Sequence, residues 1–511
     1  MEPTSTLTEA ASEIIHSLTT ISNGILVLRR SPLVIFGVLA ISLASLTMLQ
    51  SLVVPVLPAL QQEFGTSPSL ITWTLTAWLL SAAIATPILG RVGDMVGKRR
   101  TLLGVLAALA LGSLIAATAP TIGVLLIGRV IQGLGGAMFP LAFGIVRDNL
   151  PAARVLAAIG ALSAVIAVGS GLGTILAGPI VEALGWRWLF WIPLIATVVG
   201  GLLAALVIPE SASRAGGRIN WVAATLLAGW LVALLLPLSE GMVWGWGSLL
   251  VIGLFVAAAV LLAAWIVVEV RSANPLIDMR IMRLPGVWTV NLAAIFVGAA
   301  MFGIFAFFPR FVQTPTSAGY GFGATVGESG ILMLPMLIAM AAAGFISGPL
   351  ARRVGFTGQL VGGAALIGAS ALGFAFAHAT ALAISIEAGI TGFGLGIAYA
   401  AMTSLIVQGV PSSQTGVASG MNANIRTIGG ALGSTIMAAI VTSSLEPGGL
   451  PRESGYTNGY LVLAIFALGA VVAGLILPVL RRGRASQPTE AETAETPLDE
   501  VVVESPLLET A

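Results

Sequence analysis

The sequence contains no cysteine and only two histidines, His16 and His378, which lie far apart in the chain. Without cysteine the protein can form no disulfide, thiolate metal site or cysteine nucleophile, and a histidine-rich metal site is excluded as well. Asp, Glu, Lys and Arg make up 9% of the 511 residues, whereas a soluble globular chain carries about 25%. Such a sequence cannot cover a large surface that faces water.

Apolar residues, by contrast, make up 57% of the chain, and the mean hydropathy is +1.01. The 62 glycines suit packed transmembrane helices, because small residues let helix backbones approach one another. A net charge of +1, with no basic run carrying interleaved aromatics, argues against nucleic-acid binding. The composition therefore predicts an all-α integral membrane protein and argues against a soluble enzyme.

Apolar stretches long enough to cross a bilayer, which takes about 20 residues per helix, recur about fourteen times along the chain. We expect them near residues 33–60, 70–90, 101–118, 121–146, 155–180, 188–208, 219–238, 248–270, 286–309, 328–350, 357–377, 381–407, 414–443 and 459–480. The tightest connection is predicted between the third and fourth stretches.

The basic residues predict the orientation of these spans. If the N-terminus is cytoplasmic, the outside connections carry only Arg187, Arg310 and Arg452. The inside connections then carry Arg29, Arg30, Arg91, Lys98, Arg99, Arg100, Arg147, Arg154, Arg214, Arg218, Arg271, Arg280, Arg283, Arg352, Arg353, Arg481, Arg482 and Arg484. By the positive-inside rule, this asymmetry predicts a multi-pass protein of the cytoplasmic membrane with both termini cytoplasmic.

The two ends of the chain differ from the rest. No cleavable signal peptide is evident. Residues 1–32 place Ile14, Leu18, Ile21, Ile25 and Leu28 on one helical face, which indicates a cytoplasmic amphipathic segment lying on the membrane. Residues 481–511 are rich in acidic residues from Gln487 onward and predict a disordered cytoplasmic tail.

An internal repeat organises the spans. Residues 150–160 can be laid over residues 410–420, a shift of about 260. At nearly the same shift Gly90 matches Gly348, Gly160 matches Gly420, Gly169 matches Gly429, and Gly173 matches Gly433. We therefore predict two six-helix bundles, 33–208 and 286–480, with two inserted helices and their linkers in 209–285. A parallel duplication of this kind is typical of alternating-access carriers.

A charged motif follows the second predicted helix. It begins at Gly90 and continues through Asp94 and Gly97 to Lys98 and Arg99. The glycines permit a short turn, and the aspartate can cap a helix N-terminus or pair with a base. An ordinary basic loop at the inner membrane surface is the alternative interpretation. The second-half copy of this motif carries Arg352 in the position of the acid.

A second motif lies within the fourth helix, where Arg129, Gln132, Gly133 and Gly136 share one face. An arginine inside a membrane helix is costly unless it faces a cavity or a partner, so Arg129 is a candidate functional residue. The alternative is a structural role, in which Arg129 bridges helices through hydrogen bonds to carbonyls.

These motifs resemble those of the major facilitator superfamily, whose signature loop reads G-x-x-x-D-x-x-G followed by two bases, and whose fourth helix reads R-x-x-Q-G-x-G. Residues 414–430, with Asn422 and Arg426, resemble the thirteenth helix of its fourteen-spanner drug:proton antiporter branch. The resemblance covers about 33–480. It implies that Asp94 latches the two halves in the outward-facing state, with Arg147 as its expected partner. It also ties Arg129 and, on similar grounds, Arg426 to proton transfer or substrate polarity.

The chain departs from that branch at two helices. The fifth-helix signature G-P-x-x-G-G falls on residues that include Thr174 in the proline position. In the first helix Leu49 occupies the acidic position, which leaves Gln50 and Ser51 as the nearest polar groups. Glu387 is then the one acid clearly inside a span. It can carry a proton, or it can be exposed near a helix start.

We therefore predict a monomeric exporter of amphipathic small molecules, driven by proton antiport, with no cofactor beyond the coupling proton. Gln50, Asn291, Phe302 and Asn422 are the candidate residues of the substrate cavity. Two cations and at most one acid in that cavity predict a preference for neutral or anionic compounds or lipids.

Two alternatives stay open: an exporter dedicated to one natural product or lipid, and a membrane sensor that has lost coupling. The sequence contains neither H-E-x-x-H nor a phosphate-binding glycine loop, so an enzyme and ATP drive are not supported.

Overall fold

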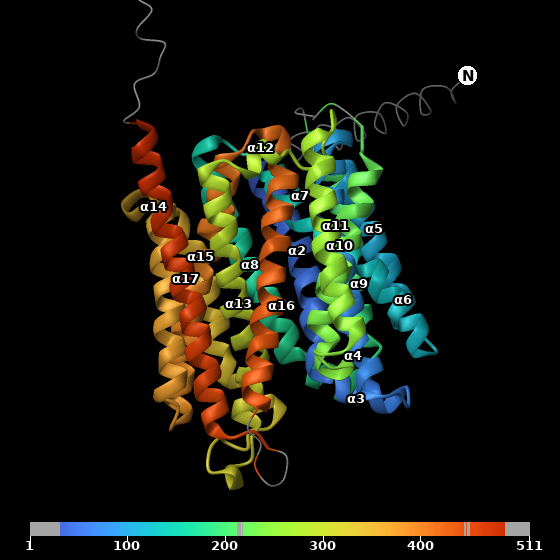
Figure 1. Ribbon diagram of the computed structural model, residues 1–511. Helices are drawn as coiled ribbons and strands as arrows, with labels where there is room; N and C mark the ends of the chain where they lie inside the picture. The colour runs from blue at the N-terminus through green and yellow to red at the C-terminus, as the bar shows by residue number, and fades with distance from the viewer. Residues whose placement is uncertain (1–30, 212–215, 217, 444–445, 447–449, 486–511) are drawn as a thin grey trace, which may run out of the picture.

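The computed structural model describes residues 31–211, 216, 218–443, 446 and 450–485. The predictions for the amphipathic N-terminal segment, up to residue 30, and for the acidic tail beyond residue 485 fall outside these residues. All long elements of the described part are helices, and their axes are nearly aligned with one another (Figure 1).

The helices of the first half are α2 (Pro32–Val53), α3 (Leu57–Glu63), α4 (Pro68–Val96), α5 (Lys98–Ala117), α6 (Ile122–Gly133), α7 (Met138–Asn149), α8 (Ala152–Leu184) and α9 (Trp188–Val207). Short 3-10 turns, η1 (Val54–Val56) and η2 (Leu134–Ala137), join α2 to α3 and α6 to α7.

The inserted helices are α10 (Trp221–Trp244) and α11 (Leu249–Arg271), and the short α12 (Met279–Met282) follows them. The second half consists of α13 (Pro285–Gln313), α14 (Val326–Phe376), α15 (Ala381–Gly409), α16 (Thr415–Thr442) and α17 (Glu453–Ala485), with the short turns η3 (Thr316–Ala318) and η4 (Ser412–Gln414).

Thirteen helices of the described chain are long and apolar enough to cross a membrane. One of them, α14, is 51 residues long and breaks at Gly355, where φ is +68°. This left-handed conformation favours glycine and turns the chain back on itself. Residues 326–354 and 356–376 therefore form two antiparallel spans, and the count agrees with the predicted fourteen. The predicted tight turn also occurs, between Ala117 and Ile122.

Most of the connections that carry basic residues lie at one end of the bundle, which we call the basic end. The α4–α5 turn, α12 and the end of α17 lie there, at the top of Figure 1. The break at Gly355 lies at the same end, because Gly355 lines one pocket with Leu156 near the start of α8 and Gln408 near the end of α15. At the opposite end lie α3, the α8–α9 turn and the α13–α14 loop.

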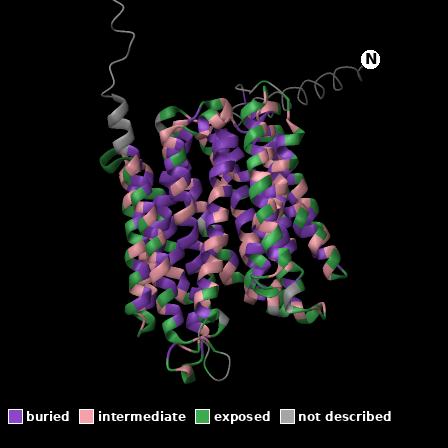
Figure 2. Cartoon of the chain, viewed as in Figure 1, coloured by how far each residue is buried: buried purple, intermediate pink, exposed green. Residues whose placement is uncertain are grey.

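The outer surface of the bundle is apolar. Figure 2 shows buried residues along the inner faces of the helices and exposed residues along the outside. Several of the exposed residues are large and apolar, such as Leu202 (63% exposed), Val260 (62%) and Ile465 (65%). In water such a surface would be unfavourable, whereas a lipid bilayer accommodates it without cost. This surface is what a membrane-spanning bundle requires.

The internal repeat reappears in the packing of its glycines. Ideal Cβ atoms on Gly169 and Gly173 of α8 would collide with α2, and those on Gly429 and Gly433 of α16 would collide with α13. Equivalent glycines therefore permit the same close helix contact, first with fifth, in each half. Such a contact requires residues without a side chain, which explains the periodic glycine signal in the sequence.

The two halves meet along two seams. At the first seam α4 packs on α16, and Gly90 lies against the backbone of Gly416. At the second seam α14 packs on α8, and Gly348 lies against Ala157. Gly90 and Gly348 are the two glycines that match in the repeat, one in each copy of the charged motif. The inserted α10 packs on both α4 and α16, so it covers only the first seam.

Candidate functional site: a latch between the halves and a central polar pocket

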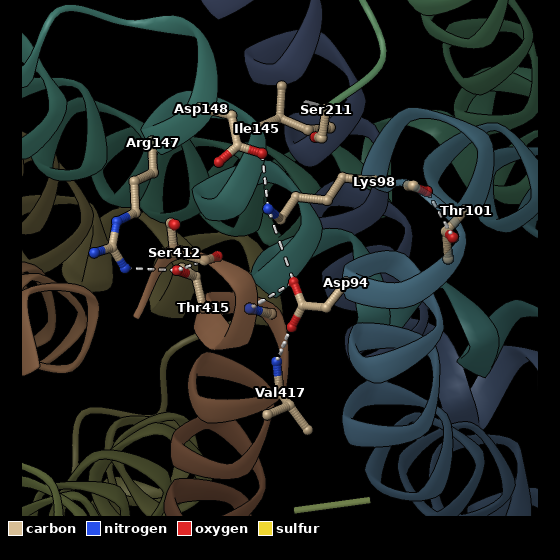
Figure 3. A network of polar contacts seen from close by, with 12 residues as sticks. Asp94, Lys98, Thr101, Ile145, Arg147, Asp148, Ser211, Ser412, Thr415 and Val417 are labelled. Carbon is tan, nitrogen blue, oxygen red and sulfur yellow. Dashed lines mark hydrogen bonds and ion pairs between the residues drawn. The ribbon is translucent and has the colours of Figure 1, made fainter. Parts of the chain in front are cut away.

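Asp94 is the centre of a polar network at the basic end of the first seam (Figure 3). It lies in the last turn of α4, and its side chain is fully buried. The carboxylate accepts hydrogen bonds from the backbone N–H groups of Gly416 (3.4 Å) and Val417 (3.1 Å), in the first turn of α16. These N–H groups have no partner within their own helix, and the positive end of the helix dipole favours a carboxylate there. Asp94 thus connects the first half to the second.

Lys98 provides the charge that accompanies Asp94 into this buried position. It begins α5, one turn after Asp94, and its side chain is fully buried. The ammonium lies 3.8 Å from Asp94 Oδ1 and donates a hydrogen bond of 2.7 Å to Asp148 Oδ2. A lysine buried alone would be strongly unfavourable, and the two carboxylates offset that cost.

The prediction that Arg147 pairs with Asp94 is wrong in this structure. Arg147 Nη1 donates instead to Val410 O (3.0 Å) and to Thr415 Oγ1 (2.7 Å). Lys98 already occupies the space beside Asp94, and Arg147, at the end of α7, reaches the α15–α16 connection instead. Asp94 and Arg147 nevertheless both bind the beginning of α16, so Arg147 belongs to the same contact between the halves. We call Asp94, Lys98, Arg147 and Asp148 the latch.

The other residues of the signature loop shape the turn. A Cβ on Gly90 would lie 2.9 Å from Gly416 O, so glycine permits the close approach of the two halves. Gly97 has a φ of +128°, and the Glu210 carboxylate packs against it. The backbone N–H of Arg99 donates to Glu210 Oε1 (3.2 Å), and its guanidinium donates to Ala205 O (2.5 Å). Arg99 therefore holds the first half together.

The second-half copy of the motif forms no latch among the described residues. Gly355 repeats the left-handed turn of Gly97, but Arg352, in the position of the acid, is exposed and contributes no ion pair there. Beside it lies a pocket of about 570 Å³ between α8, α14 and α15, lined in part by Leu156, Arg352 and Gln408. The two seams are thus alike in glycine packing and unlike in charge.

Arg129 is fully buried within the first half. Its Nε donates to Thr74 O of α4 (2.8 Å), and its Nη1 donates to Gln132 Oε1 (2.8 Å). Gln132 in turn donates to Ser113 Oγ of α5 (3.1 Å), and the guanidinium lies 5.8 Å from the Trp78 ring centre. Arg129 therefore bridges α4, α5 and α6, as the structural interpretation requires. In the second half a buried Ser370–Thr391 hydrogen bond joins the second part of α14 to α15.

A small polar pocket, which we call the central pocket, lies between the halves. It is lined by Phe139 and Phe143 from α7 and by Tyr399, Thr403, Ile406, Ser419, Asn422, Ala423 and Arg426 from α15 and α16. Arg426 donates to Tyr399 Oη (2.9 Å). The pocket measures about 10 Å³, which is room for about one water molecule. In this conformation it cannot admit a substrate.

The predicted cavity residues divide between this pocket and its surroundings. Asn422 lines it, and Asn422 Nδ2 donates to Asn291 Oδ1 (2.9 Å), which forms the next layer. Gln50 and Phe302 are not among its lining residues, and Phe302 packs against Gly430. Arg129 does not line it either, so Arg426 is the cation of this pocket.

Glu387 lies between α15 and the second part of α14, where its carboxylate packs directly against Gly373. It is half-buried and does not line the central pocket. Among the described residues it forms no ion pair within 4 Å. The Glu387 carboxylate therefore contacts helices of the second half and does not face the pocket between the halves.

Sequence reasoning missed two buried acids and one bond between the halves. Glu240 and Glu269, which the sequence did not single out as buried, are each only 2% exposed. Helix α10 continues to Trp244, six residues past the predicted apolar stretch, and this continuation places Glu240 inside a helix. Asn424 Nδ2 donates to Ala83 O (2.5 Å) across the first seam. Asn424 lies one turn after Gly420, on the face of α16 that meets α4, and this spacing was the available signal.

Two related six-helix bundles that meet around a polar pocket define a membrane transporter architecture. Residues 39–434, more than half of the chain, match the family description Major Facilitator Superfamily. The chain belongs to this superfamily, and it is a multi-pass membrane transporter.

Several curated relatives are similar over most of the chain. The multidrug transporter protein MdtP of Bacillus subtilis is 28% identical over 384 residues, covering 73% of this chain and 69% of that protein. The tetracenomycin C resistance and export protein of Streptomyces glaucescens is 28% identical, covering 76% and 71%. A multidrug resistance protein B homolog of Mycobacterium tuberculosis is 27% identical, covering 81% and 83%.

A solved structure has the same fold. The crystal structure of the human organic anion transporter MFSD10 (TETRAN) aligns with a TM-score of 0.63 at 16% identity, covering 87% of this chain and 99% of that one. At 16% identity this similarity shows the fold alone.

Proposed function

We propose that this protein exports amphipathic small molecules across the cytoplasmic membrane by alternating access, coupled to proton antiport. The observation that carries the proposal is the central pocket, to which both halves contribute lining residues while the latch joins them at one end. A separation of the halves at one end would enlarge the pocket toward that side. Relatives that are multidrug transporters or antibiotic resistance and export proteins support export as the direction.

The basic end is the cytoplasmic end in this proposal. Arg91, Lys98, Arg147, Arg271 and Arg352 lie at or near it, as the positive-inside rule requires. The closed latch then corresponds to the outward-facing branch of the cycle, and both chain termini are cytoplasmic. The protein works as a monomer, because each chain contains both halves.

The substrate preference follows from the pocket lining. Arg426 contributes a positive charge, Tyr399, Phe139 and Phe143 contribute aromatic surface, and the lining contains no acid. A cationic compound would lose its hydration in the pocket without gaining a carboxylate partner. An anionic compound would gain charge-assisted hydrogen bonds from the Arg426 guanidinium. Neutral and anionic amphipathic compounds are therefore the proposed substrates.

Proton coupling requires a carboxylate that changes its protonation state inside the membrane. Glu387 is the proposed carrier, because the described residues give it no ion-pair partner that would hold it in the charged form. Arg426 and Arg129 are the cations of the membrane interior, and of these only Arg426 faces the pocket.

The test is the accumulation of matched neutral, anionic and cationic fluorescent amphiphiles in pump-deficient cells that express the protein, with and without a protonophore. We expect reduced accumulation of neutral and anionic compounds, lost with the protonophore or in Glu387→Gln. Arg426→Gln should lower anion export at least tenfold and leave neutral export largely intact, and Arg310→Gln, an exposed arginine at the opposite end, is the control.

A dicationic compound that is exported better than its neutral counterpart would contradict the proposed selectivity. Export that persists with the protonophore would contradict proton antiport. No export across the whole panel would favour the two other hypotheses, an exporter dedicated to one compound or an uncoupled sensor.

A further inference from the structure

The inserted helices end in a connection that holds the same turn of α16 as the latch. We propose that Glu269 makes the inserted helices part of the gate, by ordering a strap, residues 272–284, over the beginning of α16. This inference rests on the proposed function and deepens it, because it assigns a gating role to a segment that would otherwise be a spacer.

Glu269 orders the strap directly. It lies in the last turns of α11, and its side chain is 2% exposed. One carboxylate oxygen accepts from the N–H of Leu276 (2.8 Å) and the other from the N–H of Ile277 (3.3 Å). Such charge-assisted bonds are roughly twice as strong as neutral ones. They fix the part of the strap before α12, residues 272–278, which has no regular secondary structure.

The two residues held by Glu269 bury their side chains in an apolar cluster that joins the inserted helices to the second half. Leu276 is 2% exposed and Ile277 is fully buried, and both belong to an apolar cluster with Val417 and Met421 of α16. Val417 is the residue whose N–H group binds Asp94. The first turn of α16 is thus held by the carboxylate of Asp94 and by the strap that Glu269 orders.

The strap is anchored at both ends. Ser272 Oγ, at its beginning, accepts from Asn220 Nδ2 (3.0 Å), which caps α10. At its other end Met282 Sδ lies 3.8 Å from Asn291 Nδ2, and Asn291 pairs with Asn422 of the central pocket. A movement of α16 away from α4 therefore has to shift or release the strap. Glu269 consequently biases the closed state of the basic end and acts as a positioning residue.

The chain offers a matched control in Glu210. Its carboxylate also accepts backbone N–H groups at the basic end, from Arg99 and Ser211 (each 3.2 Å). All of these groups belong to the first half or to the connection that follows it, and none touches α16. Glu210→Gln therefore tests the loss of a similar cap that does not cross the seam.

The experiment uses spin labels on the full-length protein in lipid nanodiscs. The natural sequence has no cysteine, so Arg100→Cys in the first half and Gln408→Cys in the second form a unique label pair at exposed sites of the basic end. Pulsed distance measurements then give the ratio of the closed population to the open one. The variants are Glu269→Gln, Leu276→Ala, Glu210→Gln and, as the reference for an opened latch, Asp94→Asn.

We expect Glu269→Gln and Leu276→Ala each to raise the open-to-closed ratio about fivefold or more, with Glu210→Gln unchanged. Leu276→Ala keeps the carboxylate and removes only the apolar contact, so it answers the question even if Glu269→Gln fails to fold.

An unchanged ratio in Glu269→Gln and Leu276→Ala, beside a shift in Asp94→Asn, would overturn the role of the strap and leave the proposed function standing. An equal shift in Glu210→Gln would also overturn it, because any capped connection would then serve. No shift in any variant, Asp94→Asn included, would remove the two-state premise and the strap's role with it.

Discussion

The Asp94 carboxylate and the backbone nitrogen of Val417 are separated by 323 residues of sequence and by 3.1 Å in space. One belongs to the last turn of α4 and the other to the first turn of α16, so the bond exists only while the two halves are together at this end. A hydrogen bond to a charged group contributes about 1.5–3 kcal/mol. A contribution of this size changes a two-state population about tenfold or more, because about 1.4 kcal/mol corresponds to a factor of ten.

Asp94→Asn should lower export at least tenfold without reducing the amount of folded protein. The amide keeps one acceptor oxygen but loses the charge that interacts with the helix dipole and with Lys98. Export rates in inverted vesicles, together with size-exclusion profiles, give both quantities. Asp148→Asn is the matched comparison, because Asp148 binds Lys98 (2.7 Å) without touching α16, and it should have the smaller effect. Equal losses in both variants would show that Lys98, not α16, is the essential partner.

Arg147 and Thr415 should be energetically coupled across the first seam. Arg147→Ala and Thr415→Val each remove the 2.7 Å hydrogen bond between them, so the double variant should cost less than the sum of the two single ones. A coupling energy of about 0.5–3 kcal/mol is expected for residues in direct contact. The closed population measured by spin labels supplies the four numbers of the cycle. Strict additivity would mean that the bond contributes nothing to closure.

Gly429→Ala should destabilise the fold, whereas Gly104→Ala should not. A Cβ on Gly429 would lie 2.0 Å from Ile295 O, a backbone atom that cannot move without separating α13 from α16. Gly104 has open space around its Cβ position, and alanine is the better helix former by roughly 1 kcal/mol. Thermal unfolding in detergent, followed by tryptophan fluorescence, should show a marked fall for the first variant and no fall for the second. Equal melting temperatures would argue against close α13–α16 packing.

Arg129→Lys should reduce stability and leave the ranking of substrates unchanged. Lysine cannot reproduce the guanidinium that bonds Thr74 O and Gln132 together, and the groups left unpaired cost about 1–3 kcal/mol. The same panel of amphiphiles, combined with melting temperatures, separates the two effects. Arg426→Lys is the contrasting variant, because it alters the pocket lining and should change the ranking. A changed ranking of substrates in Arg129→Lys would indicate that Arg129 contacts the substrate.

The sequence was sufficient for the spans and the repeat, because both leave local signals: apolar length for the helices, and glycine wherever two backbones touch. Even the broken helix α14 was foreseen as two spans, although its turn depends on the single residue Gly355. The partner of Asp94 was not foreseen. Arg147 and Lys98 are both basic and both near, and only the three-dimensional path of α5 decides which cation occupies the space.

The central pocket was predicted only in part for a similar reason. Asn422 and Arg426 lie one turn apart on the same face of α16, so their shared position in the pocket followed from the helix period. Gln50 and Phe302 lie on α2 and α13, the first helix of each half. The rotation of each helix about its axis decides whether a residue faces the pocket, and the sequence did not indicate that rotation. Glu269 gave no signal at all, because its partners are backbone groups, and a sequence does not indicate which amides will lack partners.

The two seams are not held equally firmly at the basic end. Charge, the strap and the inserted helices all hold α4 to α16. Among the described residues no ion pair joins α8 to α14, which meet at the basic end beside the 570 Å³ pocket that contains Arg352. We expect the α8–α14 side to part first. The opening would then begin as a lateral slit that faces the inner leaflet, and a membrane-dissolved compound would reach the protein from the lipid before it could do so from the cytosol.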